Sequence, residues 1–214
     1  MIHTTNNKVE ILGEIISDFE FSHSVHSEDF YTFEVRVKRL SGAYDDIKAT
    51  ISQHLLLNNA FGMGDTVSIL GQYRSYNNYS NIGNKLLLTV FVKDIYVVDA
   101  TNGVMSANVI YLNGFICKAP VFRTTPFGRE ITDTLLAVNR TYNKSDYIPC
   151  IAWGRNAKFI STLGVGTNII LWGRIQSREY EKKISETESI TKVAYEVSVN
   201  KLEVVAFNAD DKCV

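Results

Sequence analysis

The chain has 214 residues, 45% of them hydrophobic and 21% charged, proportions typical of a soluble globular protein. No apolar run approaches the ~20 residues that a membrane span needs, and MIHTTNNKVE at the start lacks the layout of a secretion signal. Three widely spaced cysteines do not predict a disulfide framework, so we expect a protein of the reducing cytoplasm.

The net charge of −1 is unevenly divided between the two halves of the chain. Residues 1–100 hold 8 Lys and Arg against 12 Asp and Glu, a net charge of −4, whereas residues 101–214 hold 14 against 11, a net charge of +3. A polyanionic partner would therefore prefer the second half. Drift between two domains is the alternative explanation.

The expected elements follow the same order twice. In the first half they are strands at 7–16, 30–39 and 46–52, a helix at 54–62, and strands at 65–76 and 85–98. The segment 98–107, rich in small and polar residues, is the expected linker. In the second half they are strands at 107–116, 130–139 and 146–153, a helix at 156–164, and strands at 167–180 and 193–205. Five strands with one helix between the third and fourth predict an OB-fold barrel, because a βαβ sheet would need a helix after most strands.

The two halves also have similar amino-acid sequences. GDTVSILGQYRSYN (64–77) resembles GTNIILWGRIQSREY (166–180) at an offset of 102 residues. Aligning DDIKATIS with SDYIPCIAW, so that Asp46 meets Asp146, gives an offset of 100. A repeat of this length indicates a duplicated domain. We therefore expect an all-β protein of two tandem OB-fold domains, residues 1–99 and 106–208.

Alternation along two strands of the second copy separates core from surface. The inward set is Ile169, Leu171, Gly173 and Ile175 on one strand and Ile148, Cys150 and Ala152 on the other. The outward set is Trp172, Arg174, Gln176, Arg178 and Tyr180 on one strand and Tyr147, Pro149, Ile151 and Trp153 on the other, with Arg155 just beyond. Proline in mid-strand removes a ladder hydrogen bond and indicates an edge or a bulge.

Aromatic rings interleaved with arginines predict a surface for single-stranded nucleic acid. Each base can stack on a ring whatever its identity, and guanidinium groups meet phosphates. The alternative is that Trp153 or Trp172 packs against the other domain or another subunit.

The second copy resembles the bacterial single-stranded DNA-binding proteins. The resemblance lies in NVIYLNGF, the P-x-x-R-x-T-P-x-G hairpin (120–128), LAVNR, IAWG and GRIQSREY. The first copy resembles the family more faintly, through VEILGEI and GDTVSILGQYRSY. The resemblance implies a non-enzymatic OB-fold protein that binds single-stranded DNA without sequence specificity and protects it in replication, recombination or repair.

The family pattern implies stacking rings and basic partners at matching positions of this chain. Glu179 stands where the family often has a basic residue. The complete candidate set for DNA binding is Tyr142, Tyr147, Trp153, Arg155, Trp172, Arg174, Arg178, Tyr180, Arg123 and Arg140, with Arg74 and Tyr76 in the first copy.

The first copy departs from this pattern. At the offsets above, Tyr147 corresponds to Ile47, Pro149 to Ala49, Trp153 to Gln53 and Arg174 to Gln72. What remains is a tyrosine group with one arginine: Tyr73, Tyr76, Tyr79 and Tyr44, with Arg74. We expect the second barrel to supply most of the affinity, and the first to assist or to build the oligomer.

The family usually assembles four OB folds, so two per chain predict a homodimer. Asp210 and Asp211 do not make the acidic tip that recruits partner proteins in the family, so we expect no recruitment through a tail. We expect no cofactor, no metal site and no membrane association. The charged run 181–192 is either a solvated loop or a mobile hairpin arm. Two other readings stay open: an adaptor of the primosome or recombination-mediator kind that binds proteins, and an RNA-binding protein.

Overall fold

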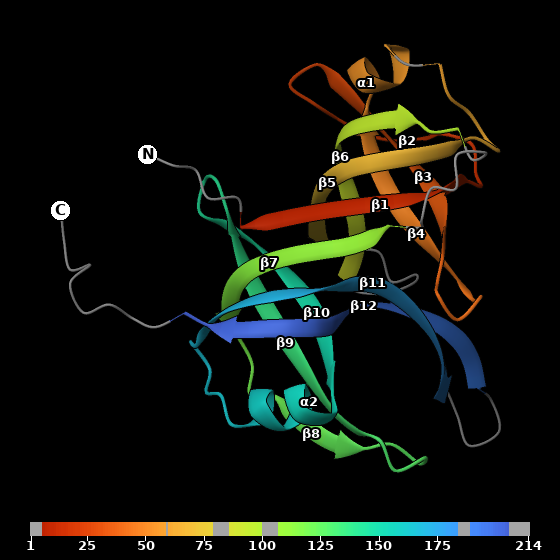
Figure 1. Ribbon diagram of the computed structural model, residues 1–214. Coiled ribbons are helices and arrows are strands. Elements are labelled where there is room, and N and C mark those ends of the chain that lie inside the picture. Colours follow the sequence, from red (N-terminus) through yellow and green to blue (C-terminus); the bar gives the residue numbers. More distant parts are fainter. Residues whose placement is uncertain (1–5, 59, 79–85, 100–106, 184–188, 206–214) are drawn as a thin grey trace.

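The computed structural model describes residues 6–58, 60–78, 86–99, 107–183 and 189–205, without the side chains of residues 181–183 and 189. The chain forms two β-barrels stacked along the long axis of the molecule, with α1 and α2 at opposite ends (Figure 1). None of the helices in these residues is long and apolar enough to cross a membrane.

Each barrel has six strands and one helix. The first contains β1 (Asn7–Ile15), β2 (Glu20–Val25), β3 (Glu28–Lys38), β4 (Tyr44–Ser52), α1 (Gln53–Leu57), β5 (Thr66–Asn77) and β6 (Leu86–Val97). The second contains β7 (Asn108–Ile116), β8 (Val121–Thr124), β9 (Glu130–Arg140), β10 (Lys144–Trp153), α2 (Gly154–Ser161), β11 (Asn168–Lys183) and β12 (Ser189–Val204). Helix α1 is shorter than predicted, because it ends at Asn58, a residue that favours caps over helix interiors.

Five strands close each barrel. In the first, β1 pairs with β5 and, at its end, with β3, while β4 and β6 pair in parallel. The second repeats this with β7, β11, β9, β10 and β12. Closure depends on Gly13 and Gly114, where a Cβ atom would lie 2.5 Å from the carbonyl oxygen of Arg36 or Ala137. The OB-fold prediction is confirmed in this topology. The short strands β2 and β8, each on the edge of the next strand, were not predicted.

The strand pairings correct the alignment of the two copies. Ala49 pairs with β6 as Cys150 pairs with β12, so the third strands correspond at an offset of 101 residues, not 100. The counterpart of Asp146 is therefore Asp45. In the same alignment Asp46, Lys48 and Ser52 stand opposite Tyr147, Pro149 and Trp153. The error arose because both Asp45 and Asp46 fit the sequence pattern, and only burial separates them.

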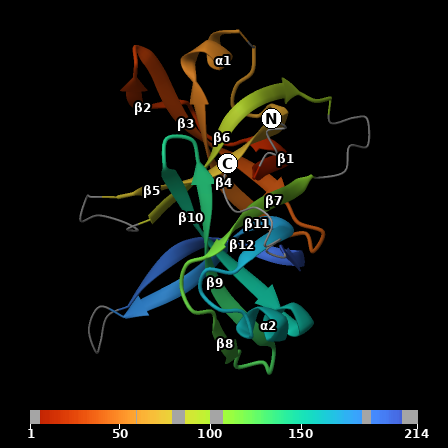
Figure 2. The ribbon, with the colours of Figure 1, turned by 90° about the vertical axis from the view of Figure 1, so that its left-hand side faces the viewer.

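An antiparallel pairing of β1 with β7 joins the barrels into one twelve-stranded sheet (Figures 1 and 2). Val9 pairs with Ile110, its own counterpart, so the two barrels are related by an approximate two-fold axis at this pair. Residues 100–106 of the expected linker lie outside the described part, and the domain limits 1–99 and 106–208 remain a proposal.

Two buried aspartates reinforce the junction symmetrically. Asp45 accepts hydrogen bonds from the backbone N–H (2.6 Å) and hydroxyl (2.9 Å) of Ser177, across the junction, and is paired with Arg39. Asp146 accepts one from the backbone N–H of Ser75 at 2.7 Å. The hydroxyl of Ser75 accepts in turn from the backbone N–H of Tyr147 at 2.7 Å, which ties β10 to the first barrel.

Candidate nucleic-acid interface

Four adjacent strands of the second barrel, in the order β11–β12–β10–β9, share one outer surface. Ser198 of β12 pairs with Arg174 of β11 on one side and with Ile151 of β10 on the other, and paired side chains point to the same side of a sheet. Alternation then places the other outward residues of both strands on this surface. We call it the aromatic face, defined by Tyr147, Trp153, Arg174, Arg178 and Tyr180.

Three rings of the candidate set are open to solvent. Tyr142 lies in the β9–β10 turn and is 92% exposed, while Tyr147 and Trp153 are 45% and 37% exposed. Among the described aromatic contacts, none involves these rings. Arg155 follows Trp153 in the first turn of α2 and is exposed. These groups can therefore meet a ligand without first losing a protein partner.

Pro149 lies between the two β10 rings without breaking the strand. Its partner on β9 is Leu135, with no shift of register. The N–H of Tyr147 points away from β9, so the nitrogen of Pro149, two residues on, does the same. The parallel ladder to β12 begins only at Cys150. Pro149 thus occupies a local strand edge, one of the two positions that its sequence context predicts.

The β11 part of the aromatic face is partly neutralised by acidic groups. Arg174 and Arg178 are exposed, and the Nε of Arg178 lies 3.6 Å from a carboxylate oxygen of Glu196. Gln176 donates a hydrogen bond to the same Glu196 at 2.9 Å and is buried, contrary to its expected outward exposure. Tyr180 is half-buried.

Arg123 of β8 is engaged by a carboxylate. Its Nε and Nη2 donate to the two oxygens of Asp133 on β9, at 2.6 and 3.2 Å. The hydrogen bond to Asp133 raises the pKa of the Arg123 guanidinium, with burial opposing and the charge of Asp133 adding to the effect. Any phosphate that Arg123 meets must therefore compete with Asp133.

Two residues expected on the outer surface are covered by protein. Trp172 is half-buried: its ring makes an edge contact with Tyr111 at 5.5 Å, and the ammonium of Lys201 lies 4.6 Å from its centre. Ile151 is buried although alternation directs it outward, at a point where β10 pairs with both β9 and β12. The alternation was read correctly, but it does not reveal what covers a side chain.

Arg74, Tyr76 and Arg140 gather at the junction of the barrels, near the end of β10 that holds Tyr147. The Nε of Arg140 lies 3.3 Å from Asp146, and its guanidinium carbon lies 5.8 Å from the ring centre of Tyr76. The guanidinium of Arg74 covers the ring of Phe91 at 3.5 Å. Protein contacts already occupy these three candidates. Their part in DNA binding stays a prediction.

The β8–β9 hairpin holds exposed residues that the sequence reasoning missed. Phe122 and Phe127 are exposed, and Arg129 follows the turn. The aromatic residue inside the turn of the P-x-x-R-x-T-P-x-G motif could have identified this hairpin as a candidate for base stacking.

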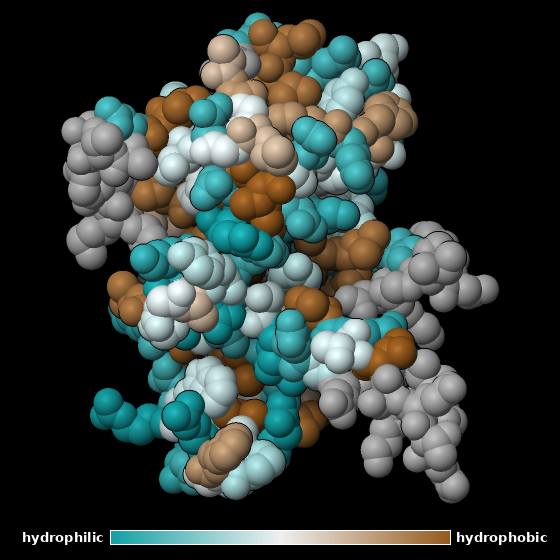
Figure 3. Space-filling view, turned by 90° about the vertical axis from the view of Figure 1, so that its right-hand side faces the viewer, coloured by the Kyte–Doolittle hydropathy of each residue, from teal (hydrophilic) through white to brown (hydrophobic). Residues whose placement is uncertain are grey.

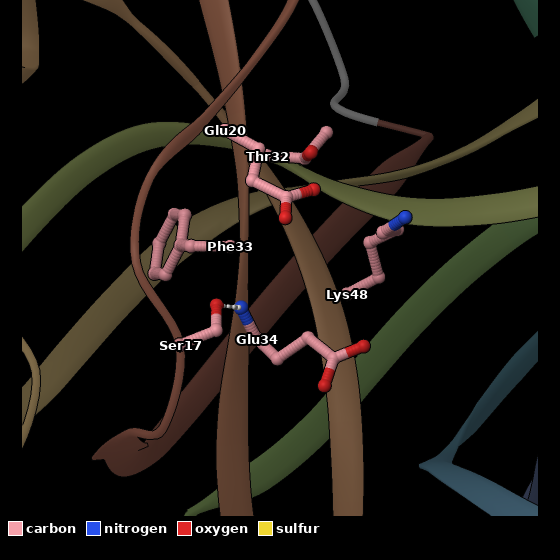
Figure 4. A pocket seen from close by; sticks show the side chains of 6 residues that line it. All are labelled: Ser17, Glu20, Thr32, Phe33, Glu34 and Lys48. Carbon is pink, nitrogen blue, oxygen red and sulfur yellow. Dashed lines mark hydrogen bonds between the residues drawn. The ribbon is translucent and has the colours of Figure 1, made fainter.

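The first barrel presents different chemistry at the position equivalent to the aromatic face. A hollow of about 250 Å³ there is lined by Ser17, Glu20, Thr32, Phe33, Glu34 and Lys48 (Figure 4). Glu34 pairs with Lys48 where the second barrel pairs Leu135 with Pro149. One carboxylate and one ammonium therefore replace two apolar groups, and Glu20 adds a second carboxylate to the hollow, which leaves an excess of negative charge that disfavours a phosphate.

The tyrosines expected to act together in the first barrel do not form a common surface in the described residues. Tyr73 is buried in the core, and burial raises the pKa of its hydroxyl. Tyr44 is exposed beside Arg36, and Tyr79 lies outside the described residues.

On the side of the molecule shown in Figure 3, hydrophobic residues form separate patches among hydrophilic ones over both barrels.

Comparison with known proteins finds relatives of the second barrel. Residues 107–205 match the family model described as "Single-strand binding protein family". This part of the chain is therefore similar to the single-strand binding protein family. Single-stranded DNA-binding protein A of Bacillus subtilis is 35% identical over 103 residues, covering 45% of this chain and 59% of that protein. The chain thus spans less than two thirds of this relative's length.

Solved structures extend the likeness to both barrels. The wild-type single-stranded DNA-binding protein from Thermus aquaticus superposes with a TM-score of 0.74 at 16% identity, covering 94% of this chain and 93% of that one. This similarity supports the two-barrel fold. The N-terminal domain of PriB from Thermoanaerobacter tencongensis is 41% identical over 44% of this chain and 99% of its own length, with a TM-score of 0.40.

Proposed function

We propose that this protein binds single-stranded DNA without sequence specificity, chiefly through the aromatic face of its second barrel, and is not an enzyme. The observation that carries the proposal is the set of open rings Tyr142, Tyr147 and Trp153 along β10 and the turn before it, with the exposed cation Arg155 following Trp153. Rings of this kind stack on any base, with about 1–3 kcal/mol for each stacked base. Similarity to proteins named for binding single-stranded DNA supports the same function.

The proposal assigns unequal roles to the two barrels. The second supplies most of the affinity, because Asp46 and Ser52 stand in the first barrel where the second has Tyr147 and Trp153, and two glutamates line the hollow nearby. The first barrel holds the second in place through the β1–β7 ladder and the serine–aspartate hydrogen bonds. We further propose a homodimer with four barrels, a cytoplasmic location, and a role in protecting DNA during replication, recombination or repair.

The quenching of tryptophan fluorescence by poly-dT tests the proposal. Trp153 is open to a stacking base, so we expect strong quenching that saturates, in the wild type and not in Trp153→Phe. No quenching at low salt would contradict DNA binding and favour the protein-binding adaptor. Stronger binding of oligo-U than of oligo-dT would favour RNA instead.

A further inference from the structure

Phe127 stands at the tip of the β8–β9 turn beside a hollow of about 490 Å³, which Thr125, Arg129 and Trp153 also line. Phe127 is 91% exposed. A ring this exposed can stack on a base without first losing a protein contact. The volume lies within the roughly 300–1,000 Å³ of typical ligand sites. The hollow is thus large enough for a planar ring and has an apolar wall that lacks a protein partner.

The turn that presents Phe127 is held in one shape by its own hydrogen bonds. The N–H of Thr125 donates to the carbonyl of Arg129 at 2.8 Å, and the N–H of Gly128 donates to the carbonyl of Thr125 at 2.9 Å. The N–H of Arg129 also donates to the hydroxyl of Thr125 at 3.0 Å. Gly128 has a φ of +73°, which glycine adopts without strain. Because the support is preorganised, little ordering entropy is lost when Phe127 meets a ligand.

The hollow combines two π surfaces with an available positive charge. Phe127 and Trp153 both line it, and no ring contact in the described part of the chain joins them. The neighbouring cations are paired, Arg123 with Asp133 and Lys158 with Glu130. By contrast, no ion pair found within the described residues includes Arg129.

We propose that this hollow is a nucleobase subsite, in which one base of single-stranded DNA stacks against Phe127 and Trp153 while Arg129 contacts an adjacent phosphate. The inference rests on the proposed function. It extends the path of the bound DNA from the aromatic face to the β8–β9 hairpin, and Trp153 belongs to both parts of this path. The described residues of the first barrel lack these groups at the corresponding place: its turn carries His26 and Ser27, and Ser52 stands in place of Trp153.

The test measures binding of fluorescently labelled poly-dT by anisotropy to the full chain and its variants. We expect Phe127→Ala to weaken binding by about fivefold or more, as loss of one stacking platform does. Arg129→Gln should reduce the slope of log affinity against log salt by about one. The matched control is Phe21→Ala, which removes an exposed phenylalanine from the corresponding hairpin of the first barrel and should bind as the wild type does.

A double-mutant cycle shows whether the two rings hold the same base. If they do, Phe127→Ala should cost much less affinity in a Trp153→Ala background than alone, because the shared base is already released. Wild-type affinity in Phe127→Ala, with Trp153→Ala impaired, would overturn the subsite and leave the proposed function standing. If the wild type itself fails to bind poly-dT, the proposed function fails first.

Discussion

The aromatic residues of this chain differ mainly in how much of each ring the neighbouring side chains leave exposed. Alternation in the sequence identified the outward direction of Tyr147, Trp153 and Trp172. It could not show that Tyr111 and Lys201 cover Trp172, because that contact depends on the pairing of distant strands. Exposed rings without such neighbours are therefore the sharper candidates for stacking bases.

Removing either ring of β10 should weaken DNA binding and leave the fold intact. We expect Tyr147→Ala and Trp153→Ala each to lower the affinity for oligo-dT about fivefold or more, since each removes a stacking platform. Tyr96→Ala, which removes a somewhat more exposed ring from the first barrel, is the control and should change nothing. Calorimetry with oligo-dT checks this, and equal losses in all three variants would speak against a localised face.

Asp133 should weaken DNA binding by holding Arg123. Asp133→Asn removes the carboxylate that accepts hydrogen bonds from Nε and Nη2 of this guanidinium, and takes a negative charge off the outer surface of β9. We therefore expect tighter binding at low salt and a steeper salt dependence, by up to about one in slope. The affinity of both proteins for oligo-dT is measured across a salt series. Weaker binding by Asp133→Asn than by the wild type would contradict this prediction.

At the level of strands and helices, local patterns predicted most of the fold. Ten strands and both helices were located, because β-branched alternation and a single helix per copy mark an OB fold. Strands β2 and β8 were missed, since short exposed edge strands carry no alternation of burial. The charged run 181–192 is partly strand, as β11 and β12 pair out to Lys183 and Ser189. The ambiguity between Asp45 and Asp46 shifted the alignment of the copies by one residue.

The two junction aspartates should respond oppositely to acid. Burial opposes the charge of Asp45, but hydrogen bonds from Arg39 and Ser177 outweigh it and lower its pKa. Asp146 is bonded less completely, and burial raises its pKa. The charge of Asp45 therefore stabilises the fold above the usual carboxyl range and loses this effect as pH falls through the lowered pKa. Protonation of Asp146 instead relieves a cost as pH falls through its raised pKa.

Matched Asp→Asn variants test this difference. At neutral pH, Asp45→Asn should destabilise the protein by about 1–3 kcal/mol, and Asp146→Asn by less. On acidification the penalty of Asp45→Asn should shrink, while that of Asp146→Asn should grow, because the wild type gains stability there. Thermal unfolding from pH 7 to pH 3 provides the measurement, and parallel trends in both variants would contradict the assignment.

The whole molecule is a duplicated barrel whose copies have diverged in surface and kept their junction. The buried aspartates and their serine partners occur in both copies, whereas the outer face of the second barrel has Tyr147 and Trp153 where the first has Asp46 and Ser52. This division fits a binding barrel held by a supporting one. The net charges of the two halves of the sequence indicate a difference between the barrels. Composition alone does not show on which face of each barrel the charged residues lie.

The most direct test of DNA binding by the aromatic face is a salt series of poly-dT anisotropy on the wild type and on Tyr147→Ala/Trp153→Ala. We predict that log affinity of the wild type falls linearly with log salt, and that the double variant loses most of the affinity at every salt concentration while its unfolding midpoint stays unchanged. Equal affinity of the two proteins, or no binding by the wild type at low salt, would contradict the account.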